Sequence, residues 1–364
     1  MNSLIYSKVQ AMSAVSNHVG ISADYLTRAL AKISGGVNLT IDSVKSIGTG
    51  QMAESYRVIF NEPLASGAES VVVKVPSQNE NSRGASRATR CYELETNFYA
   101  NLREHVKVAA PDCLHVWYDA TSDDFVLVLE DIVGATQGDQ ISGATMQQAE
   151  AAIDELVKLH YPLWGSEKLN EFNWLPKHSV TSAAGTSQLL KAMFPGFAKR
   201  FASTVSAEII SLGARLVENF DRYIAAFPDV LTVAHRDFRL DNLLFSESEK
   251  HFDVKVVDWQ TVGAMPGACD LGYFIGASFS VVDRRNNEQS LVRRYCTGLQ
   301  ARNIGVDYQD IWAQYRLLGT SGYIMAIVAS MLVKQTDRGD AMFAVMANRH
   351  GQQMLDLETE KLFA

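Results

Sequence analysis

The stretch VAHRDFRLDNLLF, residues 233–245, is the feature that most constrains the fold of this chain. It places Asp237, Asp241 and Asn242, beside a histidine and two arginines, between two apolar runs that have the composition of buried strands. A buried polar group costs free energy unless it is hydrogen-bonded or bound to an ion. The fold must therefore supply partners for this loop.

The segment continues through NLLF, the polar turn SESEKHFD and VKVVDW, which indicates an antiparallel hairpin. We expect the register that sets Leu243 opposite Val257, and hence Asn242 opposite Asp258, with Cβ atoms about 5 Å apart. Magnesium prefers oxygen ligands and takes only one or two from many proteins. We therefore predict that Asn242 and Asp258 hold Mg²⁺, which leaves Asp237 to orient a hydroxyl group and accept its proton.

Length and composition place this loop in a globular protein with two domains. The chain has 364 residues, which is too long for one small core if a domain has roughly 150 residues, and 47% of the residues are hydrophobic. The net charge of −8 offers no rows of cations for phosphates, so we expect no nucleic-acid partner. The four cysteines lack CxxC pairing or zinc-ligand spacing, which indicates reduced thiols and a cytoplasmic protein.

The N-terminal segment lacks a charged start followed by an unbroken apolar run, so we predict no secretory signal. The most apolar segment, residues 317–333, is interrupted by glycine, serine and threonine. We interpret it as a buried helix rather than a membrane span.

Local patterns predict an α+β fold in which a small antiparallel sheet is followed by a larger, mainly helical part. In the first half we expect a helix at 21–33 capped by Ser22, a helix at 87–105, and strands in IDSVKSI, SYRVIF, SVVVKV, LHVWYDA and FVLVLEDI. In the second half we expect helices at 146–164, 187–201, 207–227, 291–300, 309–334 and 338–357. We place the domain boundary after residue 132, giving domains 1–132 and 133–364.

Taken singly, each polar residue of the loop also fits an ordinary turn in which Asp or Asn bonds local backbone. The set is more specific: HRDFRLDN followed by VVDW resembles the catalytic and metal-binding loops of the protein-kinase-like superfamily. More narrowly, it resembles the aminoglycoside phosphotransferase and choline/ecdysteroid-kinase-like branch. The resemblance implies a bilobal fold, ATP and Mg²⁺ as cofactors, Asp237 as the catalytic base, and Asn242 and Asp258 as metal ligands.

The first half of the chain supplies residues that fit the nucleotide-binding part of this resemblance. In SIGTGQMAESYRV, Gly48 and Gly50 occupy a glycine-rich turn between two strands, where small residues let the backbone approach phosphates. The resemblance makes Lys74, in SVVVKV, the phosphate-binding lysine and Glu95 its counter-ion. Glu95 falls on the apolar stripe of its helix, and a carboxylate on such a face is costly unless paired; the alternative is that it borders a solvated face.

The remaining site residues follow from the same resemblance. FVLVLEDI would form the hinge whose backbone, from Glu130 to Ile132, bonds adenine. Asp270 fits a cap of the next helix; the resemblance implies that it also braces the catalytic-loop backbone near His235, and both roles are compatible. We interpret His235 itself as a packed, hydrogen-bonded residue rather than a base.

The expected function is transfer of the ATP γ-phosphate to a hydroxyl group of a small molecule. Only eleven residues lie between Asp258 and Asp270 and no APE motif follows, so a platform for a peptide is missing. The alternatives are a catalytically silent nucleotide-binding pseudokinase and, third, a protein kinase. Arg236, where relatives usually carry glycine, leaves the acceptor open among amine alcohols, aminoglycosides, sugars and sterols. Six aromatic residues could line its pocket: Trp164, Trp174, Tyr273, Trp312, Tyr315 and Tyr323.

Overall fold

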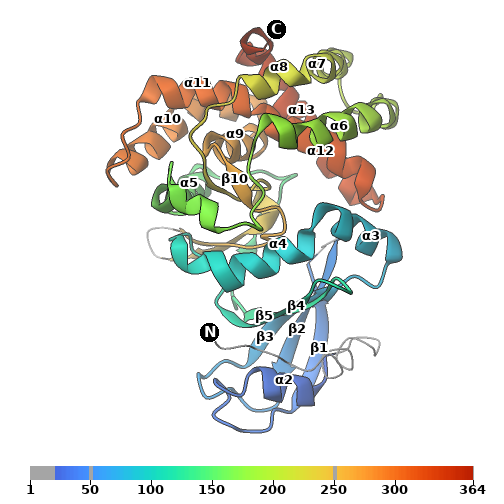
Figure 1. Cartoon of the computed structure of the whole chain (residues 1–364), viewed down its shortest axis with the longest axis vertical. Coiled ribbons are helices and arrows are strands. Elements are labelled where there is room, and N and C mark those ends of the chain that lie inside the picture. The colour runs from blue at the N-terminus through green and yellow to red at the C-terminus, as the bar shows by residue number, and fades with distance from the viewer. Residues whose placement is uncertain (1–20, 49–51, 249–251, 364) are drawn as a thin grey trace. The chain divides into compact units, whose positions relative to one another are not determined.

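A five-stranded antiparallel sheet organises the first part of the chain, in the order β1-β2-β3-β5-β4 (Figure 1). The computed structural model describes residues 21–48, 52–248 and 252–363. It divides into unit 1, residues 1–100 and 111–133, and unit 2, residues 101–110 and 134–364. The strands of the sheet are β1 (Ile41–Ile47), β2 (Ala53–Phe60), β3 (Ser70–Pro76), β4 (Cys113–Asp119) and β5 (Asp124–Glu130).

Alternation along the strands gives the sheet two different faces. On one face, Val71, Val73 and Val75 of β3 join a core that includes Leu26 of α2 (Ala23–Ala29). Ser22 caps α2 as predicted, since its side chain accepts a hydrogen bond from the Tyr25 N–H at 3.1 Å. Lys74 belongs to the opposite face of β3, because side chains alternate.

The helix predicted at 87–105 is in fact several shorter elements. Asn79 caps α3 (Glu80–Thr89), and Arg90, in the left-handed conformation at φ 59°, separates it from α4 (Cys91–Asn97). A π-helical turn and a 3-10 turn then carry the chain to His105. The predicted helix therefore started too late and missed the break, because Arg90 carries no sequence signal for a left-handed residue.

Unit 2 is mainly helical, so the predicted fold class is confirmed (Figure 1). Its helices are α5 (Met146–His160), α6 (Val180–Arg200), α7 (Ala207–Glu218), α8 (Phe220–Ala225), α9 (Ala268–Ala277), α10 (Val281–Gln300), α11 (Tyr308–Leu318), α12 (Thr320–Leu332) and α13 (Asp337–Asp356). α6 and α10 begin earlier than predicted; Ser280 caps α10 by accepting from the Asp283 N–H at 3.1 Å. The stretches predicted as single helices at 207–227 and 309–334 break at Asn219 and Gly319.

Residues 308–332, α11 and α12 together, form one stretch of the described chain that is long and apolar enough to cross a membrane. Leu318, Tyr323 and Ile327 of this stretch are fully buried in the core of unit 2. Core helices pass the same length and composition test, so the prediction of a buried helix agrees with this packing.

The short strands of unit 2 form two small sheets: β6 (Thr136–Gln137), β8 (Leu243–Glu247) and β9 (Phe252–Val256) in one, and β7 (Thr232–Ala234) with β10 (Gly263–Met265) in the other. The predicted β8–β9 hairpin is present, but its predicted register is wrong by one residue. Leu243 pairs with Val256 rather than Val257. The predicted register would set Lys255 opposite the buried Phe245, whereas the observed one pairs buried residues with each other.

Candidate functional site

Lys74 and Glu95 form a buried ion pair within unit 1. The lysine Nζ lies 2.6 and 2.7 Å from the two carboxylate oxygens of Glu95. Lys74 is 9% exposed and Glu95 1% exposed. β3 directs Lys74 to the sheet face opposite α2, and α4 supplies Glu95 from its buried side. The pairing that the resemblance implied and the apolar stripe supported is therefore present; its role toward phosphates stays a prediction.

The glycine-rich turn is described only at its ends. Gly48 follows β1 with φ +72°, a left-handed conformation that favours glycine. Gly50 lies outside the described residues. Where the chain resumes, the Met52 carbonyl accepts hydrogen bonds from the Tyr92 hydroxyl at 2.5 Å and the Ser86 hydroxyl at 3.1 Å. Two side chains thus anchor the exit of the turn.

The segment predicted as a hinge is held by side chains of the sheet. The Asp131 carboxylate accepts two hydrogen bonds from Arg57, at 2.6 and 2.9 Å, and one from Ser70 at 2.6 Å. The Glu130 N–H donates to the Asp112 carbonyl at 2.9 Å. These bonds fix the backbone up to Ile132, whose contact with a nucleotide, like that of Glu130, stays a prediction.

Asp270 braces the backbone of the polar loop in unit 2. Its carboxylate accepts hydrogen bonds from the His235 N–H at 2.7 Å and the Arg236 N–H at 2.8 Å. His160 Nε2 lies 3.2 Å from the same carboxylate. Burial alone would raise the pKa of Asp270, but the hydrogen bond and charge of His160 and the proximity of His235 lower it. Gly267, not Asp270, occupies the N-cap position of α9, so the capping alternative is wrong.

The His235 side chain also belongs to the internal bonding of the loop. Its Nε2 lies 3.0 Å from the Val257 carbonyl, and the Asp237 N–H donates to its Nδ1 at 3.3 Å. A carbonyl only accepts, so this network assigns the proton of the neutral ring to Nε2. The ring packs against Trp259, with centroids 4.7 Å apart. These contacts agree with a packed histidine rather than a base.

Within the described part of the chain, three side chains donate to the Asp237 carboxylate. The Tyr273 hydroxyl is 2.6 Å from Oδ1, Asn242 Nδ2 is 2.9 Å from Oδ2, and Arg239 Nε is 3.3 Å from Oδ2. Burial raises the pKa of Tyr273 well above its usual value, and the nearby negative charge of Asp237 raises it further. The phenol therefore stays protonated and acts as the donor in this bond.

Asn242 and Asp258 supply oxygen atoms suited to a hard cation. Asn242 uses its amide nitrogen on the Asp237 carbonyl at 2.8 Å as well as on the carboxylate, which leaves its carbonyl oxygen as the atom for a metal. Asp258 has a left-handed φ of 67°, and its Oδ2 accepts from Gln260 at 2.8 Å. No group of three or more His, Cys, Asp or Glu side chains suited to a metal occurs among the described residues. The set fits magnesium, which needs few protein ligands, better than zinc.

Sequence reasoning missed the residues that secure the C-terminal half of the loop. Arg239 donates to Asp241 as well as to Asp237. Burial alone would lower the pKa of Arg239, but these carboxylates and Tyr273 raise it, so the guanidinium stays charged. Gln140 is fully buried. Its side-chain oxygen accepts a hydrogen bond from the Leu240 N–H at 2.9 Å, and its backbone N–H donates to the Asp241 carboxylate at 3.0 Å. Gln140 lies in a glycine-rich segment, where a buried amide gives no periodic signal.

Arg236 occupies the loop in the left-handed conformation, with φ 68°. Glycine adopts this conformation at no steric cost, whereas the Cβ of any other residue disfavours it. In this chain an arginine takes its place, and its side chain lies across Gly263, where an added Cβ would come within 3.0 Å of Arg236 Cδ.

The aromatic residues proposed for an acceptor pocket have several different roles. Tyr315 and Tyr323 are fully buried and donate to Glu288 at 2.7 Å and to the Ile209 carbonyl at 2.9 Å. Tyr273 is directed to Asp237. The remaining three, Trp164, Trp174 and Trp312, are partly exposed.

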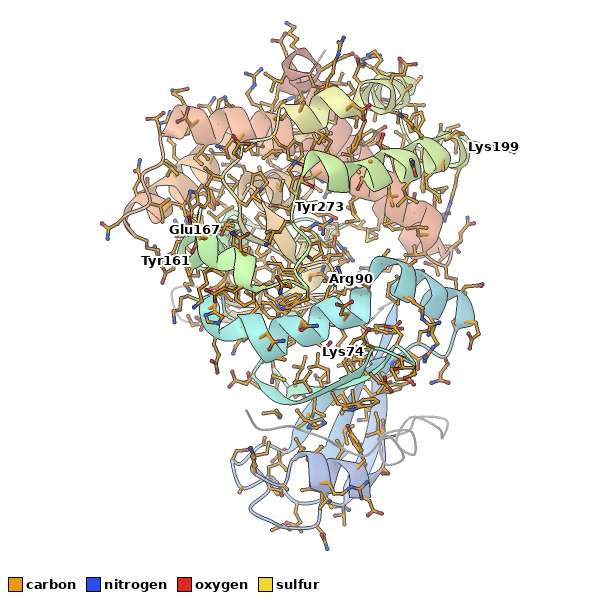
Figure 2. The ribbon with its side chains drawn as sticks, viewed as in Figure 1. Lys74, Arg90, Tyr161, Glu167, Lys199 and Tyr273 are labelled. Atoms are coloured by element: carbon orange, nitrogen blue, oxygen red, sulfur yellow. The ribbon has the colours of Figure 1, made fainter. Side chains whose placement is uncertain are left out.

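Lys74 on β3 and Tyr273 on α9 are labelled in Figure 2.

Comparison with known proteins agrees with this fold. The model of the ecdysteroid kinase-like family matches residues 52–306. Choline kinase from Cryptosporidium parvum Iowa II has 12% identity and a TM-score of 0.58, with 93% of this chain and 95% of that chain covered. The Plasmodium vivax ethanolamine kinase has 11% identity and a TM-score of 0.58, covering 96% and 95%. The GDP complex of wild-type aminoglycoside 2'-phosphotransferase-IIIa has 12% identity and a TM-score of 0.55, covering 95% and 99%.

At these identities the solved structures show the fold alone, and a search of curated proteins found no match. The fold and the loop at 235–242 define a protein of the protein-kinase-like class. Because the family model covers more than half of the chain, the protein belongs to the ecdysteroid kinase-like family.

Proposed function

We propose that this protein transfers the γ-phosphate of ATP to a hydroxyl group of a small molecule. The observation that carries the proposal is the arrangement around Asp237, whose carboxylate is oriented by hydrogen bonds from Asn242 and Tyr273. The same unit contains Asp258, whose carboxylate, like the side-chain oxygen of Asn242, suits a hard cation. The names of the structural neighbours support a small-molecule acceptor, since they include choline and ethanolamine kinases.

In this mechanism Asp237 orients the acceptor hydroxyl and takes its proton. The acceptor O–H bond breaks, a bond forms from that oxygen to the γ-phosphorus, and the bond to the β,γ-bridging oxygen breaks, which releases ADP. The chain contributes mainly position and charge, because phosphoryl transfer needs little covalent help from protein.

Lys74, fixed by Glu95, would hold the α- and β-phosphates, and the turn at Gly48 and Gly50 would cover them. Asn242 and Asp258 would hold Mg²⁺, which neutralises charge on the phosphates when bound. The backbone of Glu130 and Ile132 would bond adenine, and the GDP complex of one neighbour supports nucleotide binding by this fold. The cytoplasmic location and the division at residue 132 remain part of the proposal.

A catalytically silent nucleotide-binding protein is the second candidate. The observation that favours it is the arginine beside Asp237: the Arg239 guanidinium is 3.2 Å from Oδ1 and occupies a carboxylate oxygen that an acceptor hydroxyl would need. Such a protein would bind Mg-ATP and never turn it over.

Turnover by the wild type distinguishes the two candidates, and substitution of the proposed base tests the role of Asp237. Asp237→Asn removes the proton acceptor with almost no change in shape, so we expect turnover to fall about 100- to 10,000-fold while Mg-ATP binds as before. Acceptors are first found by thermal shift with a non-hydrolysable ATP analogue present, because a bound acceptor raises stability by mass action. Calorimetry then measures nucleotide affinity and labelled ATP measures transfer.

Asp229→Asn, at an exposed aspartate, is the matched control and should change neither quantity. Turnover that survives Asp237→Asn excludes Asp237 as the base. Binding of Mg-ATP by the wild type without transfer to any acceptor on the panel favours the silent candidate.

A further inference from the structure

The hydrogen bond from Tyr273 to Asp237 joins the polar loop to the body of unit 2. Asn242 and Arg239, the other two donors to this carboxylate, belong to the loop itself and would move with it. Tyr273 belongs to α9, a helix whose residues are all buried. Among the described residues, Tyr273 is therefore the donor that fixes the carboxylate relative to the protein core.

α9 holds the loop at two points one helical turn apart. Asp270 binds the backbone N–H groups of His235 and Arg236, and Tyr273 binds the side chain of Asp237. Residues three apart lie on the same face of a helix, so one rigid element sets both the path of the loop and the direction of its carboxylate.

Close helix packing leaves α9 little freedom to shift. A Cβ added at Gly272 would lie 2.7 Å from the Gly319 backbone, and one added at Gly276 would lie 2.4 Å from His350 Nδ1. The His350 ring in turn contacts the ring of Tyr273, with centroids 5.5 Å apart. Interiors packed at this density transmit displacement rather than absorb it, so the Tyr273 hydroxyl is held in place.

We propose that Tyr273 is a positioning residue for the phosphotransfer reaction: its hydroxyl holds the Asp237 carboxylate in the orientation that meets the acceptor hydroxyl. The inference rests on the proposed function and adds a residue to it. Tyr273 itself touches no reacting atom in this scheme. Its loss should therefore lower the rate of the chemical step and leave nucleotide binding unchanged.

The test compares Tyr273→Phe with Tyr118→Phe in the full chain. Tyr118 makes the same kind of bond in unit 1, its hydroxyl donating to the Asp123 carboxylate at 3.0 Å, so its loss controls for a missing phenol–carboxylate bond. The probes are Mg-ATP with choline, ethanolamine, an aminoglycoside and an ecdysteroid as acceptors. We expect Tyr273→Phe to lower kcat about 10- to 100-fold with the KM for ATP changed less than about twofold. Tyr118→Phe should leave both constants unchanged.

Crystal structures of the wild type and both variants supply a readout that does not depend on activity. The Asp237 carboxylate should turn from its wild-type orientation in Tyr273→Phe alone. An unchanged orientation, or an unchanged kcat in an active wild type, overturns the role of Tyr273. If the wild type transfers phosphate to none of the acceptors, the proposed function fails on this panel, and the structures alone then decide whether Tyr273 positions Asp237.

Discussion

Glu95 in unit 1 and Asp270 in unit 2 are both almost completely buried carboxylates, yet the protein stabilises their charges differently. Both oxygens of Glu95 accept hydrogen bonds from one lysine side chain. Asp270 instead accepts from two backbone N–H groups and a histidine. An ion pair depends on the identity of a side chain, whereas backbone donors depend only on the path of the chain. The two sites should therefore respond differently to substitution.

The largest expected effect is loss of stability in Lys74→Met. The change removes the cation that pairs with the buried Glu95 carboxylate, and breaking a buried pair on one side costs about 3–5 kcal/mol. Hydrogen exchange of the β3 and α4 amides measures the loss within unit 1. The double variant Lys74→Met/Glu95→Leu should recover most of the lost stability, because both charges of the pair are then removed. Equal losses in the single and double variants would contradict the assignment of the cost to an unpaired charge.

The difference between the two carboxylates also decides what could be predicted from the sequence. The Lys74–Glu95 pair was predictable from the family resemblance, and the sequence supported it because a glutamate on the apolar stripe of a helix needs a cation. The residue types of the loop at 235–242 were likewise identifiable from their spacing. Backbone partners carry no such signature, so the sequence alone left open whether Asp270 caps α9 or braces the loop.

Two further features were beyond local sequence reasoning. Tyr273 lies on a helix buried on all sides, so no amphipathic pattern shows which way its hydroxyl points. The register of β8 and β9 was predicted one residue out, because NLLF and VKVV are apolar enough to pair in either register. Packing decides the register: it pairs Phe245 with Val254 and puts Lys255 opposite Leu244.

A third buried titratable group, His350, has no carboxylate partner among the described residues to stabilise a positive charge. Its Nδ1 lies 3.2 Å from the Gln353 carbonyl oxygen, and no hydrogen bond to Nε2 is found within the described part of the chain. Burial and, to a smaller extent, the charges of Arg284 and Arg349 lower the pKa of His350 from 6.5 to about 4, against the opposing effect of the hydrogen bond with Gln353. The folded protein therefore holds this ring neutral.

The lowered pKa of His350 predicts a loss of stability in weak acid. Between pH 6.5 and about 4 the unfolded chain binds a proton at this ring that the folded chain does not, so stability is complete above pH 6.5 and declines as the pH falls. At 1.36 kcal/mol per pKa unit, the free energy of unfolding should decline by about 3 kcal/mol over this window. Urea unfolding at several pH values measures it. His350→Asn should reduce the slope in this window, and an identical slope in both proteins would be evidence against a neutral, buried His350.

Of the changes at Lys74, His350 and Asp270, Asp270→Asn should lower stability least, because the asparagine keeps one acceptor oxygen. A buried donor left without an acceptor costs about 1–3 kcal/mol, and either the His235 N–H or the Arg236 N–H loses its partner in this variant. Hydrogen exchange at these two amides measures the change directly, with Glu95→Gln as the matched amide substitution in unit 1. We expect Glu95→Gln to cost more, since it breaks the buried ion pair with Lys74. If Asp270→Asn cost more than Glu95→Gln, the charge of the acceptor would matter more for the backbone donors of the loop than for Lys74.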